Sequence, residues 1–265
     1  MAHVNENYLK LPSNYLFATI AKKVDAYSKA HPEATSIRLG IGEVTRPLAP
    51  AIIDAMHKAV DEMGKAETFR GYGPEQGYDF LRQAIIDGDY KTRGIDLELD
   101  EVFVGDGAKT DVACIQEIFG DDLKFAVADP VYPVYLDSNV MFGHTGDWNA
   151  EKGIYDGVVY LPCTPENGFK AEPPKEKVDI VYLCNPSNPS GKVFTEEELK
   201  TIADLCLRFV VFAFMVEVYE HIIYDGRKHV YMHSIPGMSE RTVSCSSLSK
   251  TYSVTGWRLG YVCGP

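Results

Sequence analysis

The sequence predicts an α/β fold in which a mainly parallel sheet carries helices on both faces. From residue 102 onward, short apolar segments typical of strands alternate with segments of helical periodicity. Three of the strand candidates are apolar runs: FAVA at 125–128, DIVYLC at 179–184 and VVFAFM at 210–215. Ligands of such sheets bind beyond the carboxyl ends of the strands. Function is therefore sought in the segments that follow the strands.

The first hundred residues predict helices and one glycine-rich loop. Apolar residues recur at helical spacing over 16–30, 50–63 and 78–90. TFRGYGPEQG at 68–77 separates the last two helices and is predicted as a loop.

The remaining elements complete the alternation. VFV at 102–104 is a short strand followed by a helix near 109–119, and further strands are expected at 242–247 and 259–263. Thr195 and Glu198 form a capping box that begins a helix running to about residue 207.

Composition excludes several classes of protein. The chain has 26 lysine and arginine residues against 38 aspartate and glutamate residues, a net charge of −12, so the basic footprint of a nucleic-acid-binding protein is missing. No apolar run reaches the roughly 18 residues of a membrane span. The first residues also lack the basic and apolar regions of a secretory signal. We therefore expect no nucleic-acid partner and no membrane association.

Cysteine and histidine spacing argues against a metal site. The six cysteines are scattered without a CxxC pair, so we expect unpaired thiols and a cytoplasmic location. None of the seven histidines has ligand spacing. His229 and His233 fall around a predicted turn, where solvated loop histidines are expected. We expect no bound metal.

A lysine after an apolar strand is the first candidate for chemistry. SSLSKTYSVTGWRLG at 246–260 places Lys250 among small hydroxyl residues, with Arg258 eight residues later. A desolvated lysine can form a Schiff base with an aldehyde. Ser247, Ser249 and Arg258 could hold a phosphate, because hydroxyls donate hydrogen bonds and a guanidinium grips two oxygens. Taken alone, the segment also fits a surface lysine.

Three further segments follow predicted strands. NPSNPSG at 185–191 forces a rigid turn that can present an asparagine amide to a ligand. GDGAK at 105–109 precedes a helix, where backbone N–H groups and Lys109 would meet a phosphate, although Walker A spacing is missing. Tyr132 in DPVYPVY could stack on a planar cofactor. An ordinary turn and a core tyrosine are the alternatives for the first and the third segment.

Together these motifs resemble the fold-type I aminotransferases that use pyridoxal 5'-phosphate (PLP). The carriers are SxSK with an arginine eight residues on, NPxNPxG upstream, and a strand leading to EVY between them. The resemblance implies a three-layer αβα large domain at residues 46–265, preceded at 1–45 by an N-terminal arm and part of a small domain. It also implies PLP as the cofactor and a homodimer.

The resemblance implies roles for individual residues. Lys250 would form the internal aldimine with the cofactor and then move the proton. Asn188 and Tyr219 would share the cofactor's phenolic oxygen. Tyr132 would stack on the pyridine ring, and Tyr72 would reach the phosphate of the partner subunit. The implied phosphate ligands are Ser247, Arg258 and the backbone of Ala108 and Lys109. Ser249 is the further hydroxyl that could bind the cofactor.

The first 150 residues look more specifically like the LL-diaminopimelate aminotransferases. ENYLKLPSNYLF, IRLGIGEVTRPLAP, TFRGYGPEQGYDFLR, VGDGAKTD and DPVYPVYLDSNVMFGHTG carry this resemblance. A carboxylate such as Glu75 suits the distal ammonium of a diamino diacid. From about residue 180 the chain looks closer to general aspartate- or kynurenine-type aminotransferases, so its two halves indicate different substrates. The residues implied to line the substrate site are Tyr15, the turn Gly40, Ile41 and Gly42, then Glu75, Lys109, Tyr132 and Asn188.

Two departures from the family pattern bear on activity. Family members carry an aspartate three residues before the active-site tyrosine, and Val216 occupies that position here. That aspartate holds the pyridine nitrogen protonated, so we expect Val216 to cut transamination by several powers of ten, at ~1.4 kcal/mol per decade. Glu217 is adjacent, but strand alternation directs it to the opposite face. Relatives also continue beyond the final Tyr-Val-Cys-Gly-Pro into a small C-terminal domain, which supplies an arginine for the substrate α-carboxylate and is largely missing here.

The sequence thus predicts PLP-dependent transamination between an L-amino acid and a 2-oxo acid such as 2-oxoglutarate. LL-2,6-diaminopimelate is a candidate donor, which would place the chain in lysine biosynthesis. A PLP lyase or synthase of the same fold shares these motifs and stays an alternative. The other alternative is a truncated or catalytically impaired PLP-binding relative, favoured by Val216. A dehydrogenase is not expected, because no GxGxxG follows a strand.

Overall fold

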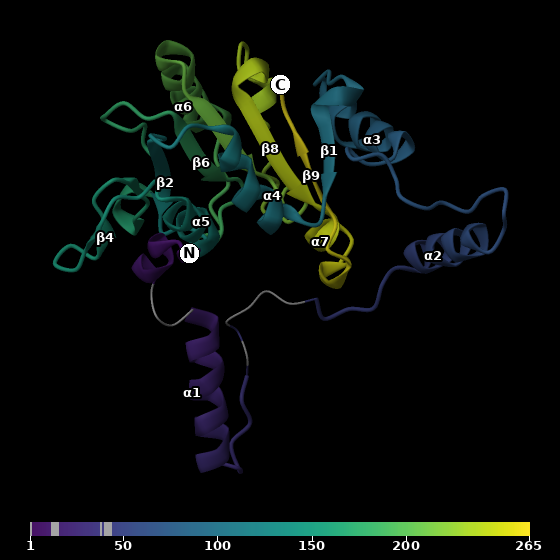
Figure 1. Cartoon of the computed structure of the whole chain (residues 1–265), viewed down its shortest axis with the longest axis horizontal. Coiled ribbons are helices and arrows are strands. Elements are labelled where there is room, and N and C mark those ends of the chain that lie inside the picture. The colour runs from purple at the N-terminus through teal and green to yellow at the C-terminus, as the bar shows by residue number, and fades with distance from the viewer. Residues whose placement is uncertain (1, 12–15, 38, 40–43) are drawn as a thin grey trace.

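A seven-stranded sheet organises the molecule in a computed structural model that describes residues 2–11, 16–37, 39 and 44–265 (Figure 1). The strand order is β1-β9-β8-β7-β6-β2-β5. Neighbouring strands from β8 to β5 are parallel, and β9 is antiparallel to both β8 and β1. The mainly parallel sheet predicted from the sequence is confirmed. The strands are β1 (Val102–Gly105), β2 (Phe125–Asp129), β5 (Val159–Pro162), β6 (Ile180–Cys184), β7 (Phe212–Val216), β8 (Thr242–Ser247) and β9 (Gly260–Cys263).

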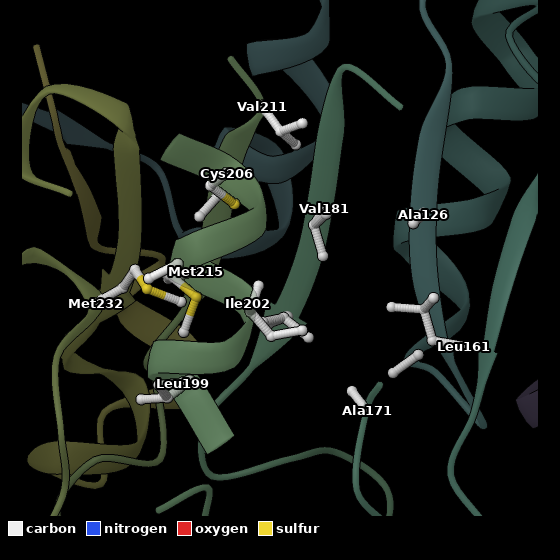
Figure 2. Packing of buried hydrophobic residues seen from close by; sticks show 14 of the residues in the cluster. Ala126, Leu161, Ala171, Val181, Leu199, Ile202, Cys206, Val211, Met215 and Met232 are labelled. Atoms are coloured by element: carbon white, nitrogen blue, oxygen red, sulfur yellow. The ribbon is translucent and has the colours of Figure 1, made fainter. Parts of the chain in front are cut away.

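Helices lie on both faces of this sheet. Helix α6 covers one face, where its buried residues pack with alternate residues of β6 and β7 (Figure 2). Helices α4 and α5 cover the other face and pack on the residues of opposite parity. The α-helices are α1 (Leu16–Ala30), α2 (Pro50–Met63), α3 (Asp79–Ile85), α4 (Ala108–Cys114), α5 (Pro133–Phe142), α6 (Glu196–Phe209) and α7 (Leu248–Thr251).

Strand alternation decides which side chains can reach each layer. In β7, Ala213 and Met215 belong to the cluster beneath α6, whereas Phe214 and Val216 belong to the cluster beneath α4 and α5. Each fully buried aliphatic or aromatic side chain of this kind contributes roughly 1.5–3 kcal/mol. Both faces of β7 are therefore fixed by burial, and a register shift by one residue would exchange them.

The capping box predicted at Thr195 is present. The Thr195 hydroxyl accepts a hydrogen bond from the Glu198 backbone N–H at 3.2 Å, and the Glu198 carboxylate accepts one from the Thr195 N–H at 2.9 Å. The other end of α6 differs from expectation. Val210, predicted to begin a strand, instead ends the helix in the left-handed region at φ 60°, and β7 begins at Phe212. The predicted helices at 16–30 and 50–63 match α1 and α2.

Helices α1 and α2 lie outside the layered body (Figure 1). No residue of α2 is buried, and its apolar residues Ile53, Met56 and Val60 are 39–69% exposed. Helix α3, in contrast, continues through a π-helical turn at Ile86–Tyr90 and packs against β1 and β9.

The sequence did not reveal β5 or the small hairpin β3 (Trp148–Asn149) with β4 (Ile154–Tyr155). VVYLP is short and bordered by loops, and β5 is fixed as a strand by its pairing with β2 rather than by its own periodicity. As predicted, the cysteines are unpaired thiols, five of them buried. Among the described helices, none has the length and apolar character needed to span a bilayer.

Candidate functional site

The carboxyl ends of the parallel strands meet at one edge of the sheet, and the residues singled out in the sequence follow them. Gly107 and Lys109 follow β1, Tyr132 follows β2, and Asn188 follows β6. Tyr219 follows β7 and Lys250 follows β8. Arg258 precedes the antiparallel β9, which begins at this same edge.

The Lys250 segment is fixed by its own serines. Ser247 ends β8 and caps α7, since its hydroxyl oxygen accepts a hydrogen bond from the Ser249 N–H at 3.1 Å. The Ser247 hydroxyl also lies 2.9 Å from the Ser249 hydroxyl and 3.0 Å from the Leu259 carbonyl oxygen. Both serines are buried, and Lys250 is half-buried in the last turn of α7. The segment therefore presents hydroxyl groups and an amine from one short turn.

The Arg258 guanidinium lies against the beginning of α4. A Cβ atom on Gly107 would come within 2.5 Å of Arg258 Nη2, the end of a long side chain. Gly107 itself has φ 115°. A Cβ atom on Gly260 would likewise come within 2.7 Å of the Ala108 nitrogen. Close approach of β9 to the first turn of α4 thus brings Arg258 and the Ala108 backbone together.

Both cationic and acidic side chains lie near the first turn of α4. Arg258 and Lys109 are exposed cations. Burial, together with the charge of Asp106, raises the pKa of Asp111 to about 6, while the guanidinium of Arg258 opposes that rise. Arg258 adopts φ 56°, the left-handed region, which is costly for a residue with a side chain. Such strain concentrates at ligand-binding positions.

Asn188 and Tyr219 are brought together from two strands. The Asn188 side-chain amide donates a hydrogen bond to the Tyr219 hydroxyl oxygen at 3.1 Å. Burial raises the pKa of Tyr219, and the hydrogen bond from Asn188 opposes that rise. Tyr132 is close enough to Tyr219 to raise its pKa further and packs edge-on against Tyr135, with ring centroids 5.8 Å apart. The structure thus gathers three of the predicted ring-binding residues.

Val216 lies in the centre of a row across three strands. It is paired with Cys184 on β6 and with Cys245 on β8, and all three belong to the apolar cluster beneath α4 and α5. Val216 is 3% exposed. Burial raises the pKa of Cys184 to about 11 and raises the pKa of Cys245 well above its usual value, so both thiols are neutral. No carboxylate belongs to this row.

Glu217 faces the opposite side of the sheet, as predicted. Its carboxylate is fully buried and lies 3.3 Å from His229 Nε2. The prediction that His229 and His233 are solvated was wrong, because their side chains are 7% and 5% exposed behind the sheet. The part of the chain that the structure describes contains no group of three metal-ligating side chains.

Other predicted residues are not gathered at this edge. Tyr72 is fully exposed, and Glu75 is also exposed, on the loop that precedes α3. That loop is held to the sheet because the Val104 N–H donates to the Gln76 carbonyl oxygen at 2.9 Å. Tyr15, Gly40, Ile41 and Gly42 lie outside the described residues.

Fold and site together define a class of protein. The family model "Aminotransferase class I and II" matches residues 157–265. The chain is similar to members of this class and to their fold-type I architecture.

The particular relatives are LL-diaminopimelate aminotransferases. The protein of that name from Lachnospira eligens is 51% identical over all 265 residues, which are 66% of its length. The one from Agathobacter rectalis is 49% identical with the same coverage. The structure of L,L-diaminopimelate aminotransferase from Chlamydomonas reinhardtii has a TM-score of 0.88 at 36% identity and is covered over 64% of its length. The chain thus spans slightly less than two thirds of these relatives.

The class implies PLP as the cofactor, and the residues at the carboxyl edge fit it. Arg258 and the Ser247 and Ser249 hydroxyls are suited to a phosphate. The missing Cβ of Gly107 lets the Arg258 guanidinium lie against the first turn of α4. The Asn188–Tyr219 pair can face a phenolic oxygen, and Lys250 is the amine that can bond an aldehyde. Val216 is the one position in this set that does not complement the ring, because a valine cannot pair with a pyridinium.

The sequence motifs did not indicate a role for Asn185, a buried polar residue at the carboxyl edge of the sheet. Asn185 is fully buried and bonds backbone groups of two different segments. The available signal was the repetition in NPSNPSG, where two asparagines precede prolines and only the second was given a role.

Proposed function

We propose that this chain carries out PLP-dependent transamination between an L-amino acid and a 2-oxo acid such as 2-oxoglutarate. The observation that carries the proposal is the convergence of Lys250, the Asn188–Tyr219 pair and Arg258 at one sheet edge. LL-2,6-diaminopimelate is the candidate amino donor, because the relatives identical at 49–51% are named for it.

Each residue has a distinct task in this proposal. Arg258 and the serine hydroxyls hold the phosphate, and Tyr132 covers one face of the ring. Asn188 donates its amide hydrogen toward the phenolic oxygen. Because Tyr219 Oη accepts from Asn188, the tyrosine hydroxyl hydrogen can point at the same oxygen. PLP, when bound, supplies the ring that withdraws electrons from the substrate Cα. The Lys250 amine holds and moves the proton at that carbon.

A catalytically impaired PLP-binding protein is the second candidate. The row of Cys184, Val216 and Cys245 favours it, since this buried neutral surface offers no anion to a protonated ring nitrogen. The two candidates share cofactor binding and differ in the rate of amino transfer.

Assembly and location are part of the proposal. Tyr72 is exposed in a position from which it can contact a second subunit, which supports a homodimer. Five buried unpaired thiols support a reducing, cytoplasmic setting. The domain boundary near residue 45 stays a prediction.

The test is glutamate formation by purified protein with PLP, LL-2,6-diaminopimelate and 2-oxoglutarate. Lys250→Ala is the inactive reference, and Lys200→Ala, an exposed lysine on α6, is the matched control. We expect glutamate above the Lys250→Ala background in the wild type and in Lys200→Ala. Cofactor absorbance without glutamate formation would support the second candidate. The absence of both cofactor absorbance and glutamate formation would refute both candidates.

A further inference from the structure

Asn185 lies at the base of both segments that supply the Asn188–Tyr219 pair. It begins the NPSNPSG turn directly after β6, and its side chain has no exposed surface. Its side-chain amide donates a hydrogen bond to the Val230 carbonyl oxygen at 3.2 Å. Its side-chain oxygen accepts one from the Phe194 N–H at 3.1 Å. Both ends of the amide group are therefore used inside the protein.

The partners of Asn185 identify what it connects. Phe194 is where the chain leaves the turn that carries Asn188, so the contact closes that turn. Val230 is where the chain returns after the segment 217–230, which leaves β7 and carries Tyr219. The Asn185 N–H also donates to the Val216 carbonyl oxygen at 3.0 Å, immediately before that segment. The Asn185 side chain thus joins the end of the Asn188 turn to the far end of the Tyr219 segment, and its backbone N–H holds the near end.

The rest of the Tyr219 segment is held at its base and at the buried Glu220, whose carboxylate lies 3.7 Å from the Arg93 guanidinium. Glu217 and His229 lie 3.3 Å apart with 0% and 7% side-chain exposure, next to the contact that Asn185 makes. Residues 224–228 between them are exposed, with Tyr224 at 73%. Tyr219 also packs against the cluster beneath α4 and α5, so its position depends on that packing together with the contacts at the two ends of its segment. The Asn185 side chain is fully buried, so loss of its hydrogen-bond partner costs more than it would for an exposed amide.

We propose that Asn185 is a positioning residue that sets the distance and orientation between Asn188 and Tyr219. It touches neither cofactor nor substrate in this account and acts through the backbone of two segments. The inference rests on the proposed PLP-dependent function, because the pair that it positions serves the cofactor.

The first experiment needs no cofactor. Asn185→Asp keeps the size of the side chain and its acceptor for the Phe194 N–H, but it places an oxygen against the Val230 carbonyl. Trypsin cleavage after Arg227 or Lys228 then reports opening of the Tyr219 segment. We expect cleavage there about tenfold faster than in the wild type, the factor that one lost hydrogen bond supplies. Cleavage after Lys200, inside α6, reports global unfolding and serves as the internal reference.

The matched control is Asn167→Asp. The Asn167 side chain also bridges backbone groups, accepting from the Thr164 N–H at 2.9 Å and donating to the Pro162 carbonyl oxygen at 2.8 Å. It lies after β5, at the far end of the sheet order from β8. This variant should leave cleavage after Arg227 and Lys228 unchanged. If Asn185→Asp does not fold, Asn185→Ser removes the same bond without adding charge.

The second experiment uses the protein with PLP and a spectroscopic readout. The pH at which the absorption band of bound cofactor shifts reports hydrogen bonding to its phenolic oxygen. Asn188→Ala should raise this midpoint by at least one pH unit. Asn185→Asp should raise it in the same direction, and Asn167→Asp should leave it unchanged.

The outcomes separate the two claims. If the wild type shows no absorption band of bound cofactor, the proposed function is refuted. The trypsin experiment would still test whether Asn185 holds the Tyr219 segment. Unchanged cleavage in Asn185→Asp would overturn the inference. Faster cleavage with a cofactor band whose midpoint is unshifted would also overturn it, because Asn185 would then anchor the segment without positioning the pair.

Discussion

Replacing Val216 with aspartate should place a carboxylate where it can pair with the protonated pyridine nitrogen of bound PLP. Val216 is 3% exposed between two neutral thiols, so a carboxyl group there loses its hydration without gaining a cation. Burial of this kind raises a carboxyl pKa by about two to three units, which corresponds to about 3–4 kcal/mol. In the absence of PLP, the variant should therefore be less stable than the wild type at neutral pH.

The sign of the pH dependence follows from the raised pKa. The cost is absent below the unfolded pKa of about 4, where the carboxyl group is protonated in both states. It grows as the pH rises through the folded pKa. Bound PLP should reverse the penalty, because a protonated ring nitrogen supplies the missing charge. The increase in melting temperature on adding PLP should then be larger for Val216→Asp than for the wild type.

Activity is the second readout. We expect glutamate formation by Val216→Asp to exceed that of the wild type by about 100-fold or more, at ~1.4 kcal/mol per decade. Val216→Asn has the same shape without the charge and should show neither the pH-dependent penalty nor the gain in rate. Equal rates in the aspartate and asparagine variants would refute the account of the Val216 position.

Three further predictions concern single side chains. Val210→Gly should raise the free energy of unfolding, measured by urea denaturation, by about 1 kcal/mol. Val210 adopts φ 60° and is 62% exposed, so glycine should relieve backbone strain at little loss of contact. An unchanged free energy of unfolding would mean that the contacts of Val210 offset the strain. Arg258→Gly should also raise the melting temperature of the cofactor-free protein, because Arg258 adopts φ 56°. The same change should weaken PLP binding at least tenfold, because it removes the guanidinium from the phosphate. Unchanged PLP affinity would show that Arg258 does not bind the phosphate. Burial and the charge of Glu217 raise the pKa of Glu220 to about 8, so stability from this group is lost as the pH rises from about 4.5 toward 8. Glu220→Gln should flatten the stability profile in that window, and a profile as steep as that of the wild type would contradict the assignment.

Much of the fold could be predicted because its signals are local. Apolar runs such as 179–184 and 125–128 mark buried strands, and the Thr195 capping box marks the start of α6. Each candidate residue follows a predicted strand in the sequence, which was enough to place these residues at the carboxyl edge of the sheet. β5 escaped although β1 and β9, of the same length, were predicted; its pairing with β2 is what identifies it as a strand. Val210 was misplaced because its β-branched side chain favours a strand, while the end of α6 requires a left-handed turn there.

The site was predictable only as a set of candidate residues. Alternation directed Glu217 away from Val216, and the structure agrees, because that rule depends on neighbouring residues alone. The burial of His229 and the role of Asn185 depend on contacts across 12 and 45 residues of sequence. No local pattern reports such contacts, so only the three-dimensional arrangement could identify them.

Reductive trapping would show directly whether Lys250 bonds the PLP aldehyde. The purified protein would be mixed with PLP, reduced with borohydride, digested and analysed by mass spectrometry. We expect one dominant phosphopyridoxyl group on the peptide that contains Lys250. Excess inorganic phosphate in the mixture should abolish it. Labelling spread over surface lysines such as Lys200, or equal labelling in Lys250→Ala, would contradict the assignment of this sheet edge as the cofactor site.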